Sequence, residues 1–111
     1  MTSQDISNLI IQTATSYGVD PRLCLEVAMQ ESGLDNSKVS PAGAIGIFQL
    51  EPPTAADLGV DPHDPAQNID GGVRYLMQLL GKYSGNVAEA LAANDWGMGN
   101  LDKALAAHGV A

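Results

Sequence analysis

The chain has 111 residues, 45% hydrophobic but only 5% aromatic, which is enough apolar material for one domain with a mainly aliphatic core. Thirteen acidic residues against 5 basic ones give a formal net charge of −8, which disfavours nucleic acid as a partner because phosphate binding needs clustered lysine and arginine. No apolar run approaches the roughly 18 residues of a membrane span, and the N-terminal residues lack the basic and apolar regions of a signal peptide.

The first half of the chain predicts two helices separated by a tight break. Thr2 or Ser3 is suited to cap a helix that runs to about Tyr17 and ends at Gly18. The pair Asp20-Pro21 then places an N-cap residue directly before a proline at the first helical position, which is a strong start signal. This second helix is expected to end at Gly33.

The middle of the chain predicts a long loop and a short helical turn. Residues 34–53 are rich in Gly, Ser, Pro and Asn, although residues 45–50 form an apolar run too short to assign. Thr54 is suited to cap a brief turn that ends at Gly59.

The longest predicted helix opens at Asp64-Pro65 and runs to about Tyr83. Its apolar stripe follows helical spacing and consists of Ile69, Val73, Leu76 and Leu80. Gly71-Gly72 inside this helix predicts the close approach of another backbone, because glycine otherwise weakens a helix interior. Beyond it, a short helix over 87–93, a glycine-rich loop over 94–100 and a final helix to about His108 complete a mainly α domain of five or six helices.

Glu31 is the most unusual polar residue of the second helix. It shares one helical face with Cys24, Val27 and Ala28, and Gly33 places it in the last turn. Apolar neighbours and the negative end of the helix dipole both oppose ionisation, so its pKa is expected to be raised, which suits a general acid. The alternative is a glutamate that points into water at a helix end.

Other chemistries lack a pattern in this sequence. His63 and His108 are isolated, no metal-binding spacing or phosphate loop occurs, and we expect neither a metal nor a cofactor. Cys24 has no basic neighbour in sequence and is interpreted as a small buried hydrophobe. The remaining chemistry depends on carboxylates, and sugar cleavage is the usual setting for a protonated glutamate.

Several ordered motifs carry a resemblance to a known family. They are Glu-Ser-Gly at 31–33, Ser-Pro-Ala-Gly-Ala-Ile-Gly-Ile-Phe-Gln-Leu at 40–50, Asp-Pro-x-x-Asn-Ile with Gly and Tyr-Leu at 64–76, and Ala-Leu-Ala-Ala-Asn-Asp-Trp-Gly-Met-Gly at 90–99. Together they resemble the catalytic domain of soluble lytic transglycosylases, relatives of goose-type lysozyme. The resemblance implies one compact lysozyme-like domain over 1–111, all-α, with about five to seven helices and long loops that form a substrate cleft.

The resemblance also implies a reaction and a site. The substrate would be the peptidoglycan glycan strand, cleaved between N-acetylmuramic acid and N-acetylglucosamine to leave a 1,6-anhydromuramic acid end. Glu31 would be the general acid and base, and Ser32, Phe48 and Gln49 would line the cleft and bind sugar groups. We expect a monomer that acts on the bacterial cell wall, in the periplasm, outside the cell or delivered by a phage, without a membrane span.

The last motif departs from the family pattern. Asn94-Asp95 stands where the family has Tyr-Asn. Asp95, or Glu51 just after Gln49, could activate water, which would make the enzyme a hydrolytic muramidase. Trp96 is expected either to stack on a sugar or to pack in the core. A third hypothesis is a non-catalytic module that binds peptidoglycan.

Overall fold

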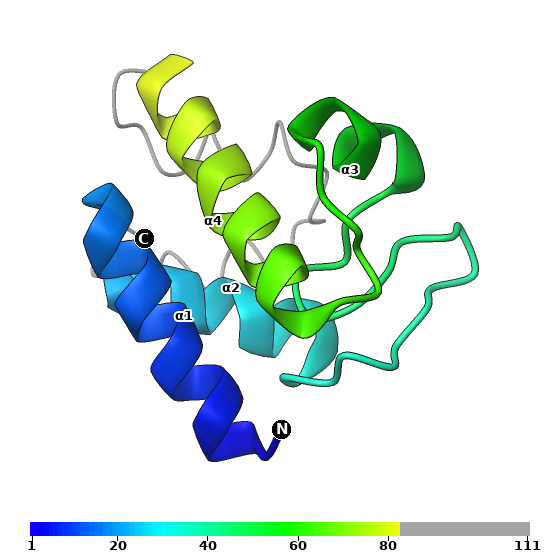
Figure 1. Cartoon of the computed structure of the whole chain (residues 1–111), viewed down its shortest axis with the longest axis horizontal. Coiled ribbons are helices and arrows are strands. Elements are labelled where there is room, and N and C mark those ends of the chain that lie inside the picture. The colour runs from blue at the N-terminus through cyan, green and yellow to red at the C-terminus, as the bar shows by residue number, and fades with distance from the viewer. Residues whose placement is uncertain (83–111) are drawn as a thin grey trace.

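The computed structural model describes residues 1–82, which form four helices: α1 (Ser3–Tyr17), α2 (Pro21–Ser32), α3 (Pro52–Leu58) and α4 (Pro65–Lys82). Within this part of the chain there is no sheet, only two isolated bridges that pair Ile45 with Val39 and with Leu50. Figure 1 shows α1 beside α4, with α2 crossing behind them and the loop between α2 and α3 extending to one side. The predicted helices over 87–93 and 100–108 lie outside the described residues.

The first two helices begin and end where the sequence predicts. Thr2 forms a capping box with Asp5: its Oγ1 accepts from the Asp5 N–H and its own N–H donates to the carboxylate. Gly18 ends α1 in the left-handed region with φ 72°. Asp20 caps α2 by accepting from the Arg22 N–H, and Gly33 ends that helix with φ 64°.

The start of α3 corrects the sequence prediction. The helix begins at Pro52 rather than after Thr54, and Glu51 occupies the N-cap position in extended conformation without a side-chain capping bond. Proline fits the first helical turn because its φ is already helical and its missing N–H would have had no helical partner. The predicted end at Gly59 is confirmed.

The core lies between the three longer helices. α1 packs against both α2 and α4, and α3 packs against α4. Ile69, Val73 and Leu76 of the predicted stripe are buried, whereas Leu80 is only partly buried against the core. The other members of the contiguous core cluster come mainly from α1, α2 and the 45–50 loop: Ile6, Ile10, Ala14, Val19, Leu23, Cys24, Val27, Ala28, Ile47, Phe48, Leu50 and Ala55.

The glycine pair in α4 does admit close neighbours, and the nearest atoms belong to side chains of the loops before and after α3. A Cβ at Gly72 would overlap the side chain of Phe48, and one at Gly71 would press on the side chains of Val60 and Leu50. The pair therefore seats loop side chains against the helix and fixes where the 45–50 loop lies.

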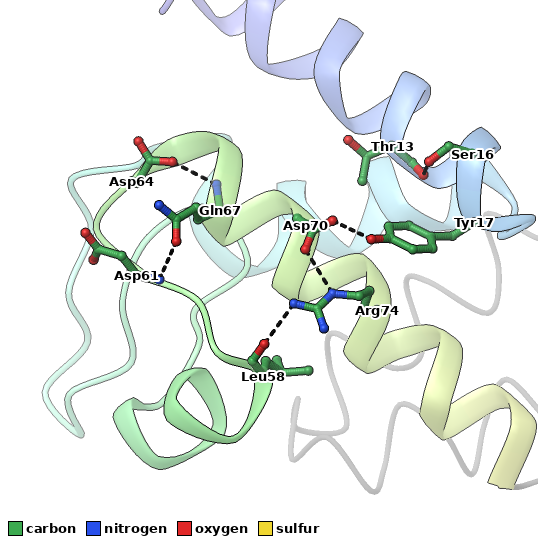
Figure 2. A network of polar contacts seen from close by, with 9 residues as sticks. All are labelled: Thr13, Ser16, Tyr17, Leu58, Asp61, Asp64, Gln67, Asp70 and Arg74. Carbon is green, nitrogen blue, oxygen red and sulfur yellow. Dashed lines mark hydrogen bonds and ion pairs between the residues drawn. The ribbon is translucent and has the colours of Figure 1, made fainter.

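A polar network on the outside of the bundle joins α4 to two other helices (Figure 2). The Tyr17 hydroxyl donates to Asp70 at 2.6 Å, which connects α1 to α4. Arg74 forms an ion pair with the same carboxylate at 2.9 Å and also donates to the Leu58 carbonyl at the end of α3. The hydrogen bond to Asp70 raises the pKa of the Tyr17 hydroxyl.

Candidate active site

Glu31 lies in the last turn of α2, as predicted, and is half-buried. The residues predicted to share its face, Cys24, Val27 and Ala28, are all buried. The backbone carbonyl of Glu31 accepts a 2.7 Å hydrogen bond from Lys38 Nζ, which brings a cation to the negative end of the helix. The raised pKa expected for the carboxyl group stays a prediction.

Ser32 connects the end of α2 to the loop that follows. Its hydroxyl donates to the Ile47 carbonyl at 2.7 Å and accepts from the Asp35 N–H at 3.2 Å. The hydroxyl therefore makes its hydrogen bonds within the protein. These bonds hold the 45–50 loop against the end of α2, next to Glu31. Its predicted contact with a sugar stays a prediction.

The 45–50 loop is tightly closed on itself. Ile45 and Leu50 exchange both backbone hydrogen bonds at 2.9 Å, which forms an antiparallel bridge across the loop. Within it, Gly46 has φ 78° and Gln49 has φ 51°. The left-handed conformation is rare for a residue other than glycine, so the closure of the loop holds Gln49 where it would not lie by preference.

The side chain of Asn68, on α4, holds the 45–50 loop in place through hydrogen bonds. Its side chain is fully buried, with Oδ1 accepting from the Phe48 N–H at 2.8 Å and Nδ2 donating to the carbonyls of Ile45 and Pro62 at 2.9 Å each. A Cβ at Gly46 would overlap this amide, so only glycine allows the approach. The sequence reasoning gave Asn68 no role of its own. A usable signal was its spacing of four residues before Gly72 and eight before Leu76, which places it on a buried face.

The structure gives Phe48 and Gln49 different surroundings. Phe48 is only 2% exposed and packs against Gly72, so it offers little surface to a substrate and we assign it to the packing beneath the loop. Gln49 is half-buried, and its Nε2 donates to the carbonyls of Lys38 at 3.0 Å and Gly46 at 2.8 Å. The structure therefore brings Glu31, Ser32 and the Gln49 loop together.

The remaining predicted residues separate into exposed and undescribed ones. Glu51 is exposed at the start of α3. Asn94, Asp95 and Trp96 lie outside the described residues. Across residues 1–82 no group of three or more His, Cys, Asp or Glu could hold a metal ion. Burial raises the pKa of the Cys24 thiol to about 12, which makes it a poor nucleophile.

A comparison with protein families shows which family the chain belongs to. The family described as "Transglycosylase SLT domain" matches residues 8–110. The chain belongs to this family. No helix in the described part of this SLT domain is long and apolar enough to cross a membrane.

Individual relatives agree with the family. The SLT domain is 43% identical over 100 residues to "Membrane-bound lytic murein transglycosylase F 1" of Alkalilimnicola ehrlichii, covering 84% of this chain and 20% of that protein. It is 43% identical over 81 residues to "Transglycosylase" of Enterobacteria phage PRD1, covering 72% of this chain and 30% of the phage protein. The chain thus spans less than a third of the length of these relatives.

Solved structures share the lysozyme-like fold. The 70 kDa soluble lytic transglycosylase of Escherichia coli matches with a TM-score of 0.74 and 25% identity, over 90% of this chain and 18% of that one. An inactive mutant of the lytic transglycosylase Slt from Pseudomonas aeruginosa matches with a TM-score of 0.71 and 25% identity, over 86% of this chain and 17% of that one.

Proposed function

We propose that this domain is a peptidoglycan lytic transglycosylase that cleaves the β-1,4 bond between N-acetylmuramic acid and N-acetylglucosamine. The observation that carries the proposal is the position of Glu31, half-buried in the last turn of α2 with the 45–50 loop bonded to the adjacent Ser32, in a chain of the SLT family. A half-buried carboxyl group at the end of an apolar helix face suits a general acid.

Glu31 would serve in both halves of the reaction. As general acid it gives its proton to the glycosidic oxygen while the C1–O bond breaks, and the acetamido group of the same muramic acid stabilises the cationic C1. As general base it then takes the proton of the C6 hydroxyl, whose oxygen bonds to C1 and closes the 1,6-anhydro ring. The carboxyl group ends protonated, as it began, and no water is consumed.

Hydrolysis is the alternative outcome at the same site. It would require a second carboxylate that directs water at C1, for which Asp95 and the exposed Glu51 are the candidates. A module that binds peptidoglycan without cleaving it is the other alternative. In each case the setting would be the bacterial cell wall.

Digestion of purified peptidoglycan followed by mass spectrometry tests the proposal. We expect muropeptides that are lighter by one water than those with a reducing end; reducing ends would establish hydrolysis instead, and intact wall with bound protein would leave only the binding module. Glu31→Gln should abolish cleavage, and support comes from the Pseudomonas aeruginosa relative, whose inactive mutant carries a glutamine in place of a glutamate.

A matched control is available on the same helix. Glu26 is also a half-buried glutamate of α2, and it accepts a hydrogen bond from Gln30 at 3.1 Å. Glu26→Gln should keep the activity of the wild type. Full activity in Glu31→Gln would exclude Glu31 as the acid and with it the proposed mechanism.

A further inference from the structure

The last turn of α2 leaves the Glu31 carbonyl without a helical donor. Gly33 ends the helix, and its N–H donates to the Met29 carbonyl at 3.0 Å. In a continued helix the Glu31 carbonyl would accept from the Asp35 N–H, but that group donates to Ser32 Oγ at 3.2 Å. No basic residue lies in the last turn of α2. A cationic donor for this carbonyl therefore has to come from outside the helix.

The chain after α2 turns back and brings Lys38 to the helix end. Leu34 has φ 64°, a left-handed conformation that is rare for a residue with a side chain, and the Lys38 N–H donates to the Asp35 carbonyl at 3.3 Å. Through this turn Lys38 Nζ lies 2.7 Å from the Glu31 carbonyl oxygen. The bond brings a positive charge to the negative end of the helix dipole, and a charged donor makes a stronger hydrogen bond than a neutral one.

The backbone of Lys38 is fixed independently of its side chain. Its carbonyl accepts from the Gly46 N–H at 2.8 Å and from Gln49 Nε2 at 3.0 Å. Lys38 therefore bonds to the 45–50 loop through its backbone and to Glu31 through its ammonium group. A substitution of the side chain keeps the carbonyl and both bonds to the loop, so it removes only the bond to Glu31.

The peptide group between Glu31 and Ser32 is thus held from two directions. Lys38 Nζ binds the Glu31 carbonyl, and the Ser32 hydroxyl donates to the Ile47 carbonyl at 2.7 Å. Lys38 is exposed, so water competes for its ammonium group and the bond contributes little to the free energy of unfolding. Its consequence is local, because the Glu31 side chain is attached to the backbone atoms that the bond fixes.

We propose that Lys38 is a positioning residue for Glu31: its ammonium group holds the Glu31 backbone where the carboxyl group can transfer its proton. This inference rests on the proposed function, because it takes Glu31 as the general acid and base. Proton transfer requires the carboxyl group within hydrogen-bond reach of the glycosidic oxygen. A displacement of the last turn of α2 therefore lowers kcat, while the affinity for the glycan strand changes less.

Steady-state kinetics on soluble, uncrosslinked peptidoglycan strands tests the inference, with the release of anhydromuropeptides as the measured rate. Lys38→Met removes the ammonium group, so kcat should fall about fivefold while KM stays within about twofold of the wild type. Lys38→Arg keeps a cationic donor and should recover most of this loss. The matched control is Arg22→Met, which removes the same charge from an exposed position at the start of α2 and should keep the kcat of the wild type.

Urea unfolding and carbon-13 nuclear magnetic resonance separate positioning from a purely structural role. In Lys38→Met the unfolding midpoint should stay close to that of the wild type, whereas the Glu31 carbonyl resonance should shift. In Arg22→Met neither should change. A loss of rate that a smaller folded fraction explains, or an equal loss in Lys38→Arg or Arg22→Met, would overturn the inference.

Failure of the inference is distinct from failure of the proposed function. Unchanged kcat in Lys38→Met would overturn the role of Lys38 while the wild type still releases anhydromuropeptides. A wild type that releases none would overturn the proposed function, and the inference with it.

Discussion

Replacing Asn68 should cost the domain a large part of its stability. Asn68→Ala deprives the Phe48 N–H and the Pro62 carbonyl of a hydrogen-bond partner, whereas the Ile45 carbonyl keeps its bond from the Leu50 N–H. The Phe48 N–H is buried, so leaving it without a partner costs about 1–3 kcal/mol, and the half-buried Pro62 carbonyl adds a smaller cost because water can reach it. Domains of this size are stable by only about 5–15 kcal/mol, so the variant should unfold at much lower urea concentration.

Asn68→Asp separates the loss of hydrogen bonds from the loss of volume. The introduced carboxylate is nearly the same size but faces the carbonyls of Ile45 and Pro62 with an oxygen in place of a donor. Repulsion and burial raise its folded pKa above the unfolded value of about 3.9. Its destabilisation relative to the wild type is therefore full above the folded pKa and shrinks as pH falls toward the unfolded value.

Urea unfolding monitored by circular dichroism measures both effects, with Gln78→Ala as the control on the exposed side of the same helix. The control should change the free energy of unfolding by no more than about 0.5 kcal/mol. At urea concentrations below the unfolding transition, the Phe48 amide of Asn68→Ala should exchange its hydrogen faster than in the wild type. The variant should also lose activity, because the 45–50 loop is displaced. A loss of less than about 1 kcal/mol of unfolding free energy in Asn68→Ala would refute the stabilising role of the Asn68 hydrogen bonds.

Three further predictions follow from burial and local geometry. Gly72→Ala should destabilise the domain by about 1–3 kcal/mol because its Cβ meets the buried ring of Phe48. Gly81→Ala, in open space on the same helix, should stabilise it by about 0.5–1 kcal/mol. Equal effects of the two substitutions in urea unfolding would contradict the close packing of Phe48 on Gly72. Cys24, whose pKa burial raises to about 12, should react with Ellman's reagent at pH 8 only after unfolding, and rapid reaction of the native protein would contradict its burial. Because its hydrogen bond to Asp70 raises the pKa of Tyr17 above 10.0, the stabilisation from this bond is full below that value and is lost as pH rises through the folded pKa. In ultraviolet titration Tyr17→Phe should therefore remove a tyrosine that ionises above its usual range, and an unchanged alkaline limb would contradict the hydrogen bond to Asp70.

The helix boundaries were predictable because their causes are local. Asp20 and Pro21 start α2, and Gly18 and Gly33 end α1 and α2, through hydrogen bonds and dihedral preferences that involve only a few neighbouring residues. The start of α3 was misplaced because Thr54 satisfies the same local rule as a cap. The adjacent prolines satisfied the first turn without one.

The site divides along the same line. Sequence by itself determined that Glu31 ends an apolar helix face and that a glycine-rich loop follows, since helical period and capping are properties of adjacent residues. Only the tertiary structure decided how that loop is held. Asn68 bonds to Phe48 and Ile45, which lie 20 and 23 residues earlier in the sequence. Phe48 packs against Gly72 of α4, and Lys38 joins Gln49 to the Glu31 backbone. Such contacts depend on which side chains meet in space, and no local preference encodes the direction in which the amide of Gln49 points.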